Sequence, residues 1–330
     1  MTKIETIQTN LDFNPFKFKK DSLKAIDLFA GIGGIRLGFQ EAFGKNIEFV
    51  FSSEIDKYAK QTYYANFGEV PYGDITKIDE KDIPPHDIIL AGFPCQAFSI
   101  AGKRLGFEDT RGTLFFDVAR IATYHKPKLI FLENVKGFLN HDKGNTFKVV
   151  KQTLEDLGYK VYSKVLNAKD FGVPQNRERI YIVAFLDNVD FDFPNNLNKN
   201  VSIHDMFETK IDDKYYYNNK PLFEKIKDDV ANKDSIYQWR RKYVRENKSG
   251  VCPTLTANMG TGGHNVPIIK DNRGIRKLTP KECLNFQGFP RNFKLPNIAD
   301  GQLYKQAGNS VVVEVIKEIA KSINNSFLKV

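Results

Sequence analysis

The feature that most constrains the fold is a series of short runs that are apolar throughout. These runs are Leu23–Ala30, Ile47–Ser53, Asp87–Phe93, Lys128–Val135 and Arg179–Leu186, with a further strand expected near Tyr159–Leu166. Continuous apolar residues, as opposed to alternating ones, are typical of strands buried on both faces of a parallel sheet. Amphipathic segments such as 113–124 lie between the runs. The alternation predicts an α/β fold with a doubly wound, mostly parallel, Rossmann-like sheet.

This alternation of apolar runs and amphipathic segments ends near Pro194, and the following residues are richer in Asn, Lys, Asp and Tyr. We therefore expect a large first domain over residues 1–194 and a smaller second domain over 195–280. A connecting segment, 281–308, should follow. The apolar spacing within 309–330 predicts a helix over Val313–Phe327 that packs back on the first domain.

Composition limits the possible partners of the chain. The 330 residues carry a formal charge of +9, which suits a polyanionic partner such as nucleic acid, although a solvated basic surface would give the same count. The three cysteines are odd in number and form no CxxC pair, and the five histidines are scattered, so we expect no disulfide framework and no metal site. We see no signal peptide and no membrane-spanning run, and expect a cytoplasmic protein.

A glycine-rich turn ends the first apolar run, in the order Phe29-Ala30-Gly31-Ile32-Gly33-Gly34. A dinucleotide fingerprint would need a third glycine where Arg36 stands, which argues against a pyrophosphate ligand. Glu54 ends the second run about 20 residues later, at the position where an acid contacts ribose hydroxyls. We expect Asp74 to end a third short strand and to accept a hydrogen bond from an adenine amino group. The turn alone would fit a purely structural role equally well.

Reactive side chains follow the next two runs. Cys95 comes directly after Pro94, and Glu133 ends the Lys128–Val135 run. Because ligands bind outside the carboxyl ends of parallel strands, both should lie at one edge of the sheet, near Arg177 and Arg179. A thiolate is a nucleophile available near neutral pH when its pKa is lowered. Burial as a small hydrophobe is the better interpretation of the other two cysteines, and a structural salt bridge with an arginine is the alternative for Glu133.

With these motifs in order, the chain resembles the DNA cytosine-5 methyltransferases of bacterial restriction–modification systems, most closely the HhaI type. The matching segments are Phe29–Gly34, Glu54, Gly73-Asp74-Ile75, Gly92–Ser99, Gly106–Leu114, Glu133-Asn134-Val135, Gln175–Tyr181, Arg276–Pro290 and Gln306–Val312. The resemblance implies transfer of a methyl group from S-adenosylmethionine to carbon 5 of a flipped cytosine in a specific short site of double-stranded DNA. It also implies protection of host DNA from a cognate restriction endonuclease, with which no stable complex forms, and action as a monomer.

The same resemblance assigns roles to residues. Residues 1–194 become the catalytic and cofactor-binding domain, 195–280 the target-recognition domain and 281–308 a hinge and motif segment. Cys95 becomes the nucleophile, Glu133 holds the cytosine edge, and Arg177 and Arg179 hold the base or the loop. The implied cofactor-binding residues are Phe29, Ala30, Gly31, Gly33, Gly34, Glu54, Ile55, Asp74, Ile75, Pro94, Leu114, Phe289, Asn309 and Val311.

A loop over Gln96–Gly112 is implied to close over the flipped base. Its implied DNA contacts are Gln96, Ser99, Lys103, Arg104 and Arg111. Two residues depart from the closest relatives. Ile55 stands where those relatives stack a Trp on adenine, which leaves an apolar contact, and Ala101 replaces a Ser that contacts DNA.

Between Ile236 and Arg276 the chain has eight Lys or Arg residues and two acids, interleaved with Tyr237, Trp239 and Tyr243. Basic and aromatic residues together suit nucleic acid, although a solvated basic loop would look similar. Since this stretch falls where the family keeps its target-recognition domain, we expect it to read DNA. The candidate contacts are Gln238, Arg240, Arg241, Arg245, Thr254 and Asn258, and a short target rich in G and C is expected because arginine most often reads guanine.

Three alternatives remain at this stage. An RNA cytosine methyltransferase is possible because a eukaryotic branch of the family modifies transfer RNA. A non-catalytic DNA-binding paralogue is disfavoured by the intact Cys95, Glu133 and Arg179. A nicotinamide reductase is disfavoured by Arg36 and by the Pro-Cys loop.

Overall fold

The apolar runs of the first half of the chain form one six-stranded sheet in the computed structural model, which describes residues 22–94, 114–261 and 265–327. The strand order is β2-β1-β3-β4-β6-β5. The strands are β1 (Leu23–Leu28), β2 (Ile47–Ser53), β3 (Ile88–Ala91), β4 (Leu129–Val135), β5 (Lys160–Asn167) and β6 (Glu178–Phe185). Neighbours from β2 to β4 are parallel, whereas β6 runs antiparallel to both β4 and β5. The predicted α/β class with a mostly parallel sheet is confirmed.

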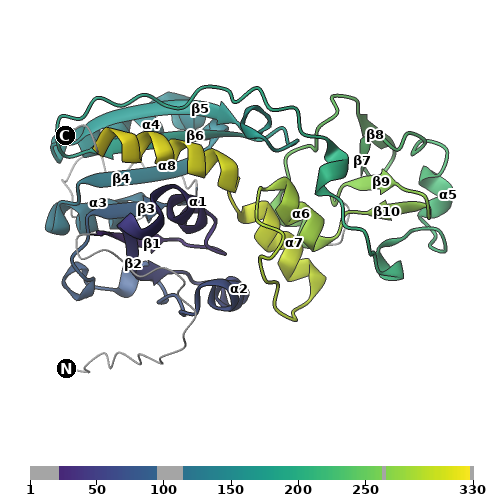
Figure 1. Cartoon of the computed structure of the whole chain (residues 1–330), viewed down its shortest axis with the longest axis horizontal. Coiled ribbons are helices and arrows are strands. Elements are labelled where there is room, and N and C mark those ends of the chain that lie inside the picture. The colour runs from purple at the N-terminus through teal and green to yellow at the C-terminus, as the bar shows by residue number, and fades with distance from the viewer. Residues whose placement is uncertain (1–21, 95–113, 262–264, 328–330) are drawn as a thin grey trace.

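Helices cover both faces of this sheet (Figure 1). On one face lie α1 (Gly34–Phe43) and α8 (Val313–Phe327), whose apolar residues share a core with β1, β3, β4 and β6. On the other face lie α3 (Leu114–His125) and α4 (Asn145–Asp156). Helix α2 (Lys57–Phe67) follows β2, begins at the capping side chain of Asp56 and ends at Gly68 in the left-handed region. The predicted bounds of α8 are confirmed.

One expected strand is absent. Asp74 does not end a strand: its side chain caps a short 3-10 helix, Ile75–Lys77, and accepts from the backbone N–H of Thr76. Only an isolated bridge between Ser53 and Tyr72 extends the sheet at this point. A polar segment of this kind gains more from an Asp cap than from a strand pairing on a sheet edge.

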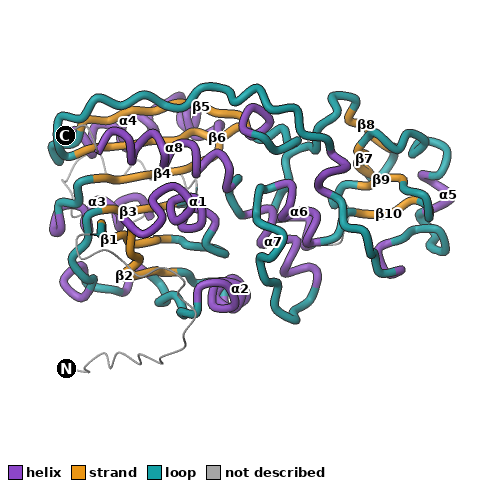
Figure 2. The backbone as a smooth tube through the Cα atoms, viewed as in Figure 1, coloured by secondary structure: helices purple, strands orange, loops and turns teal. Residues whose placement is uncertain are grey.

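A second, four-stranded sheet lies apart from the first (Figure 1). Its order is β10-β9-β7-β8, all antiparallel, with β7 (Ile236–Trp239), β8 (Val244–Asn247), β9 (Ile268–Lys270) and β10 (Ile275–Lys277). Between β6 and β7 the chain is mostly loop and contains α5 (Phe223–Ile226) (Figure 2). We refer to β7–β10 as the small sheet. No helix in the described ranges is long and apolar enough to cross a membrane.

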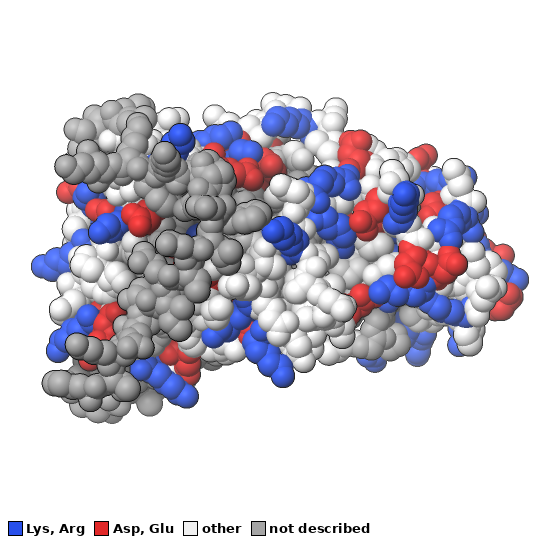
Figure 3. Space-filling view, turned by 60° about the horizontal axis from the view of Figure 1, so that its bottom comes forward, with Lys and Arg blue, Asp and Glu red and all other residues white. Residues whose placement is uncertain are grey.

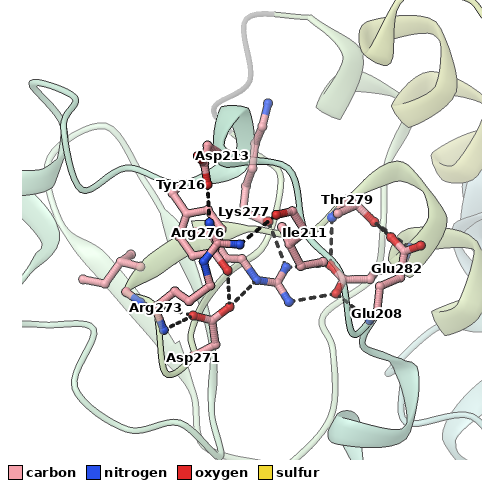
Figure 4. Close-up of polar contacts among 12 residues, drawn as sticks. Glu208, Ile211, Asp213, Tyr216, Asp271, Arg273, Arg276, Lys277, Thr279 and Glu282 are labelled. Atoms are coloured by element: carbon pink, nitrogen blue, oxygen red, sulfur yellow. Dashed lines mark hydrogen bonds and ion pairs between the residues drawn. The ribbon is translucent and has the colours of Figure 1, made fainter.

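Buried ion pairs tie the small sheet to α6 (Pro280–Phe286), which precedes α7 (Asp300–Asn309). The guanidinium of Arg276, on β10, donates to both carboxylate oxygens of Glu282 at 2.7 and 2.8 Å and to Asp271 at 2.7 Å (Figure 4). Glu282 is also the second half of a capping box with Thr279. Since an isolated buried charge is very unfavourable, this closed set of partners fixes β10 against the start of α6.

Candidate active site

The turn after β1 bends sharply enough to open space at the carboxyl edge of the sheet. Phe29 and Gly31 both have positive φ, 55° and 56°, and a side chain at Gly31 would meet no atom within 4 Å. Ala30 donates its backbone N–H to Ser53 at 2.9 Å, which ties the turn to the end of β2. The backbone is thus held close to an open cavity, as ligand binding by a glycine-rich turn requires.

Glu54, directly after β2, is fixed against that turn. One carboxylate oxygen accepts from the backbone N–H of Gly31 at 2.7 Å, and the other accepts from Asp56 at 2.8 Å. Each oxygen can accept a further hydrogen bond, because a carboxylate has about four lone-pair positions on its two oxygens. The carboxylate is therefore pre-positioned at the mouth of the cavity to accept from hydroxyl groups of a ligand.

The cavity has a volume of about 410 Å³. Most of the predicted residues line it: Phe29, Ala30, Gly31, Gly34, Glu54, Ile55, Asp74, Ile75, Pro94, Leu114, Glu133, Arg177, Arg179, Asn309 and Val311. Residues from the ends of β1, β2, β3 and β4 thus meet residues from the junction of α7 and α8. Its size falls in the range of small-molecule and cofactor sites.

Two predicted cofactor residues are not among the lining residues. A side chain on Gly33 would collide with the ring of Phe67 at 2.2 Å, so this glycine permits helix packing. Phe289 is buried and packs edge-on against Phe293, with ring centroids 4.6 Å apart. It also lies close to Gly34, where an added Cβ would meet its ring at 3.2 Å. Phe289 therefore lies behind the turn.

Arg36, at the position of the missing third glycine, is a buried structural residue. Its guanidinium lies 4.7 Å from the ring centroid of Phe49 and 4.4 Å from that of Phe67. It also donates to the hydroxyl of Tyr63 at 2.9 Å and pairs with Glu69. The side chain points into the packing of α1 on α2, which is why the turn tolerates it.

Glu133 and Arg179 form the charged centre of the cavity. Nε of Arg179 lies 3.1 Å from Oε1 of Glu133, and both side chains are nearly buried. Burial raises the pKa of Glu133 above its usual value, although Arg179 and Arg177 oppose this. Within the part of the chain that the structure describes, Oε1 of Glu133 has no hydrogen bond of good geometry. A carboxyl group with a raised pKa beside a fixed guanidinium is suited to exchange a proton with a polar ring and to orient it.

Asn134 is a site residue that the sequence reasoning did not assign. Its amide donates to the carbonyl of Phe93 at 2.9 Å and accepts from the backbone N–H of Val135 at 2.8 Å. It therefore fixes the chain just before Pro94 and Cys95. The Glu-Asn-Val motif could have indicated this role, because an asparagine amide buried at a strand end needs hydrogen-bond partners for both its oxygen and its nitrogen.

Arg177 lines the cavity, but its described partners are backbone carbonyls. The guanidinium donates to Leu255 at 2.7 Å, to Gly308 at 3.2 Å and to Ser310 at 2.6 Å. Leu255 precedes a short 3-10 helix, Ala257–Gly260. Gly308 and Ser310 lie at the C-terminal end of α7 and line the cavity. Arg177 therefore joins two segments that are far apart in the sequence.

Further lining residues come from α7 and from the start of α2. Lys305 pairs with Asp56 at 2.7 Å, and Gln306 accepts from Thr62 at 2.8 Å. The sequence reasoning missed Asp56, Lys305, Gln306 and Ser310 as cavity residues. Gln306 and Ser310 lie in the Gln306–Val312 motif, so a signal was present. Lys305 had none, since its place depends on how α7 meets α2.

The predicted DNA contacts divide into three groups. Gln96, Ser99, Lys103, Arg104 and Arg111 lie outside the described residues, as does the predicted nucleophile Cys95. Arg240, Arg241, Arg245 and Asn258 are exposed, whereas Gln238 is buried in β7. Thr254 donates to the carbonyl of Asn176 at 2.6 Å and so holds the backbone.

Fold and site together define an α/β methyltransferase. A family model for C-5 cytosine-specific DNA methylases matches residues 23–325. The chain is 52% identical to the type II methyltransferase M.Bsp6I of Bacillus sp. (strain RFL6), over 93% of this chain and 100% of that relative. It is 44% identical to the type II methyltransferase M.HhaI of Haemophilus parahaemolyticus, over 92% and 95%.

A solved structure of a Spodoptera frugiperda DNMT2 mutant has a TM-score of 0.72 and 25% identity, and covers 92% of this chain and 100% of that one. The chain belongs to the C-5 cytosine-specific DNA methylase family. Its reaction is the methylation of cytosine at carbon 5 in DNA, and the resemblance read from the motifs is confirmed.

Proposed function

We propose that the cavity at the sheet edge binds S-adenosylmethionine, and that Cys95, Glu133 and Arg179 methylate a flipped cytosine in a short duplex site. The observation that carries the proposal is the position of the Glu133–Arg179 pair, which lines the same cavity as the Glu54–Gly31 contact. One end of the cavity thus suits a nucleoside and the other a polar base.

The residues present fit this cofactor. Glu54 can accept from ribose hydroxyls, Asp74 retains an acceptor oxygen, and Ile55, 75% exposed, offers an apolar contact to the adenine ring. Gly31 and Gly73 leave open space beside them. S-adenosylmethionine supplies an electrophilic methyl group. No phosphate needs to be bound, which agrees with Arg36 at the third position of the turn.

The reaction needs a nucleophile at carbon 6 of the cytosine ring. Cys95 directly follows Pro94, which lines the cavity. The carbonyl of Phe93, just before Pro94, accepts a hydrogen bond from the side-chain amide of Asn134. Addition of the thiolate to carbon 6 makes carbon 5 enamine-like and able to take the methyl group. Loss of the carbon 5 proton to a base then releases the thiolate and restores the ring.

Glu133 and Arg179 would act on the polar edge of the same ring. Glu133 would donate a proton towards ring N3 as the thiolate adds, and its raised pKa makes the carboxyl better able to hold that proton beforehand. Arg179, held by Glu133, can neutralise charge that develops at the ring carbonyl. A cytosine stacked in duplex DNA cannot reach a cavity at a sheet edge, so the base must be flipped out.

We further propose residues 1–194 as the catalytic and cofactor-binding domain, 195–280 as the target-recognition domain, 281–308 as a hinge and motif segment, and 309–330 as the C-terminal helix that returns to the catalytic domain. Lys and Arg side chains are spread over the part of the molecule that holds the small sheet, with acids among them (Figure 3). Pairing with a restriction endonuclease, monomeric action and a cytoplasmic location complete the proposal. Transfer RNA is the second candidate substrate.

The test is a covalent trap. A duplex with 5-fluorocytosine at the target should form a denaturation-resistant adduct with the wild type, because fluorine cannot leave as a proton does. Cys95→Ala should form none and should lose methyl transfer by several orders of magnitude, with DNA binding retained. The matched control is Cys283→Ala, which removes a thiol buried in α6. A Cys95→Ala enzyme with a few per cent of wild-type activity would contradict the mechanism, and faster transfer to transfer RNA than to duplex DNA would contradict the substrate.

A further inference from the structure

The turn between β7 and β8 presents an unbalanced group of basic side chains. The basic members are Arg240, Arg241 and Lys242, which are exposed like the neighbouring Tyr243, and a 2.9 Å hydrogen bond from the backbone N–H of Arg240 to the carbonyl of Tyr243 closes the turn. Arg241 has a φ of 66°, a conformation that few residues other than glycine adopt. No acid in the described ranges forms an ion pair with these basic residues or with Arg245. The group therefore suits a polyanion.

The pleat of β7 decides which side of the hairpin each side chain occupies. Tyr237 and Trp239 pack into the core of the small sheet with Ile268 and Ile275. Ile236 points the opposite way and belongs to the core that contains Leu255, Met259 and Ile32. Because side chains alternate along a strand, Gln238 lies on the Ile236 side, whose core also contains Ile32, a residue that lines the catalytic cavity. Arg245 is directly opposite Gln238 on β8 and shares this side.

Gln238 holds only one of the basic side chains. Its Oε1 accepts a 3.0 Å hydrogen bond from Nη2 of Arg240, and Gln238 as a residue is only 7% exposed. A buried glutamine in a strand is fixed by its packing, so it fixes the guanidinium that it binds. An amide acceptor is neutral and therefore orients Arg240 without neutralising it. Arg241 and Lys242 have no such support among the described residues.

We infer that Gln238 is a positioning residue that aims Arg240 at a guanine of the target site, whereas Arg241 and Lys242 contact phosphates. The inference rests on the proposed function, since it assigns roles within the DNA-reading surface. Guanine offers two acceptors, O6 and N7, to a guanidinium plane held in one orientation. Phosphate contacts demand no fixed plane and carry no sequence information, so unsupported side chains at a turn suit them.

The experiment measures discrimination at each position of the target. Bisulfite sequencing of a random-library plasmid methylated by the wild type first gives the target sequence. Relative kcat/KM is then measured on duplexes that each carry one base-pair change. Arg240→Ala should lose about 5- to 150-fold of discrimination at one G·C position and little elsewhere. Arg241→Ala, the matched control from the same turn, should weaken all duplexes alike and lower the salt slope by about one unit.

Variants of Gln238 separate positioning from simple folding. Gln238→Leu removes the acceptor and should reduce discrimination at the Arg240 position. Gln238→Glu retains an acceptor at the same place, so it should keep discrimination at that position, but its charge offsets that of Arg240 and should lower affinity for every duplex alike. In an Arg240→Ala background, Gln238→Leu should have no further effect on that position. A simple loss of folding would instead lower activity on every duplex and would persist in the double variant.

Two results would overturn the inference. Arg240→Ala could weaken all sequences equally, which would make Arg240 a phosphate contact, or Gln238→Leu could lower discrimination by the same factor with and without Arg240. In both cases the wild type would still methylate its site, and the proposed function would stand. Absence of site-specific methylation by the wild type would instead contradict the proposed function itself.

Discussion

Arg179 and Glu133 face each other across adjacent antiparallel strands, with Nε of the arginine 3.1 Å from Oε1 of the glutamate. The register pairs Arg179 with Val135 and Glu133 with Tyr181, so the ion pair is diagonal across the ladder. The antiparallel direction of β6 brings the start of that strand to the sheet edge where the parallel strands end. An arginine that begins one strand can therefore meet a glutamate near the end of another.

The first prediction concerns the proton of Glu133. Glu133→Gln keeps the shape of the side chain but cannot give up a proton, so kcat should fall by about 10²- to 10⁴-fold with little change in cofactor affinity. Rapid-quench methyl transfer and equilibrium titration measure the two quantities. Glu178→Gln is the control, because Glu178 lies on the same strand as Arg179 but pairs with Lys136 at the surface. Equal losses in the two variants would contradict a special role for Glu133.

The second prediction concerns the anchor of the cofactor. Glu54→Ala removes the acceptor that holds Gly31 and that would bind the ribose, so cofactor affinity should fall by about 10- to 100-fold. DNA affinity should stay close to that of the wild type. Isothermal titration with S-adenosylmethionine, with Glu155→Ala as an exposed control on α4, gives the comparison. An unchanged affinity would exclude Glu54 from the site.

The third prediction concerns the contact between α7 and the segment that Arg177 holds. A Cβ on Gly308 would lie 2.1 Å from the carbonyl carbon of Thr256, a backbone atom that cannot rotate away as the end of a flexible side chain can. Gly308→Ala should therefore destabilise the protein by roughly 1–3 kcal/mol and also weaken cofactor binding, because Gly308 lines the cavity. Gly137→Ala, where an added Cβ meets no atom within 4 Å, is the control. Urea unfolding measures the stability of both, and similar values would contradict the prediction.

The fourth prediction concerns pH and Asp27, which lies on β1 beneath the cavity. Burial, with a smaller contribution from the charge of Glu54, raises the pKa of Asp27 to about 7 against the opposing charge of Arg36. Tyr63 donates to Asp27, and Oδ1 of Asp27 has no partner in the described structure. The folded state therefore holds this proton more tightly than the unfolded state. The resulting stability is present below about pH 4 and is lost as the pH rises through about 7.

The variant that tests this is Asp27→Asn, which stays neutral at every pH. Relative to this variant, the wild type should lose on the order of 4 kcal/mol of unfolding free energy between about pH 4 and pH 8. Urea titrations at several pH values provide the measurement. A difference between the two proteins that does not change with pH would show that Asp27 is not the titrating group.

The sequence predicted most of the sheet because its strands are continuous apolar runs, and it predicted most of the cavity because the motifs end those runs. It did not predict the direction of β6, since an antiparallel strand buried on both faces has the same composition as a parallel one. The role of Arg177 in joining two chain segments was also not predictable. Its acceptors are the backbone carbonyls of Leu255, Gly308 and Ser310, and every residue type has such a carbonyl. Asp74 lines the cavity, but a helix cap positions it there and not the end of a strand.

Helix α8 packs on α1 so closely that a Cβ at Gly38 would lie 2.6 Å from a methyl group of Ile316. All six strands of the large sheet precede β7 in the chain, yet the helix that completes one face of their core follows α7. During synthesis on the ribosome, the part of this face that α8 covers stays exposed while the small sheet, α6 and α7 are made. The nascent catalytic half should therefore be prone to aggregation until α8 emerges, and dependence on a chaperone should be greatest in that interval.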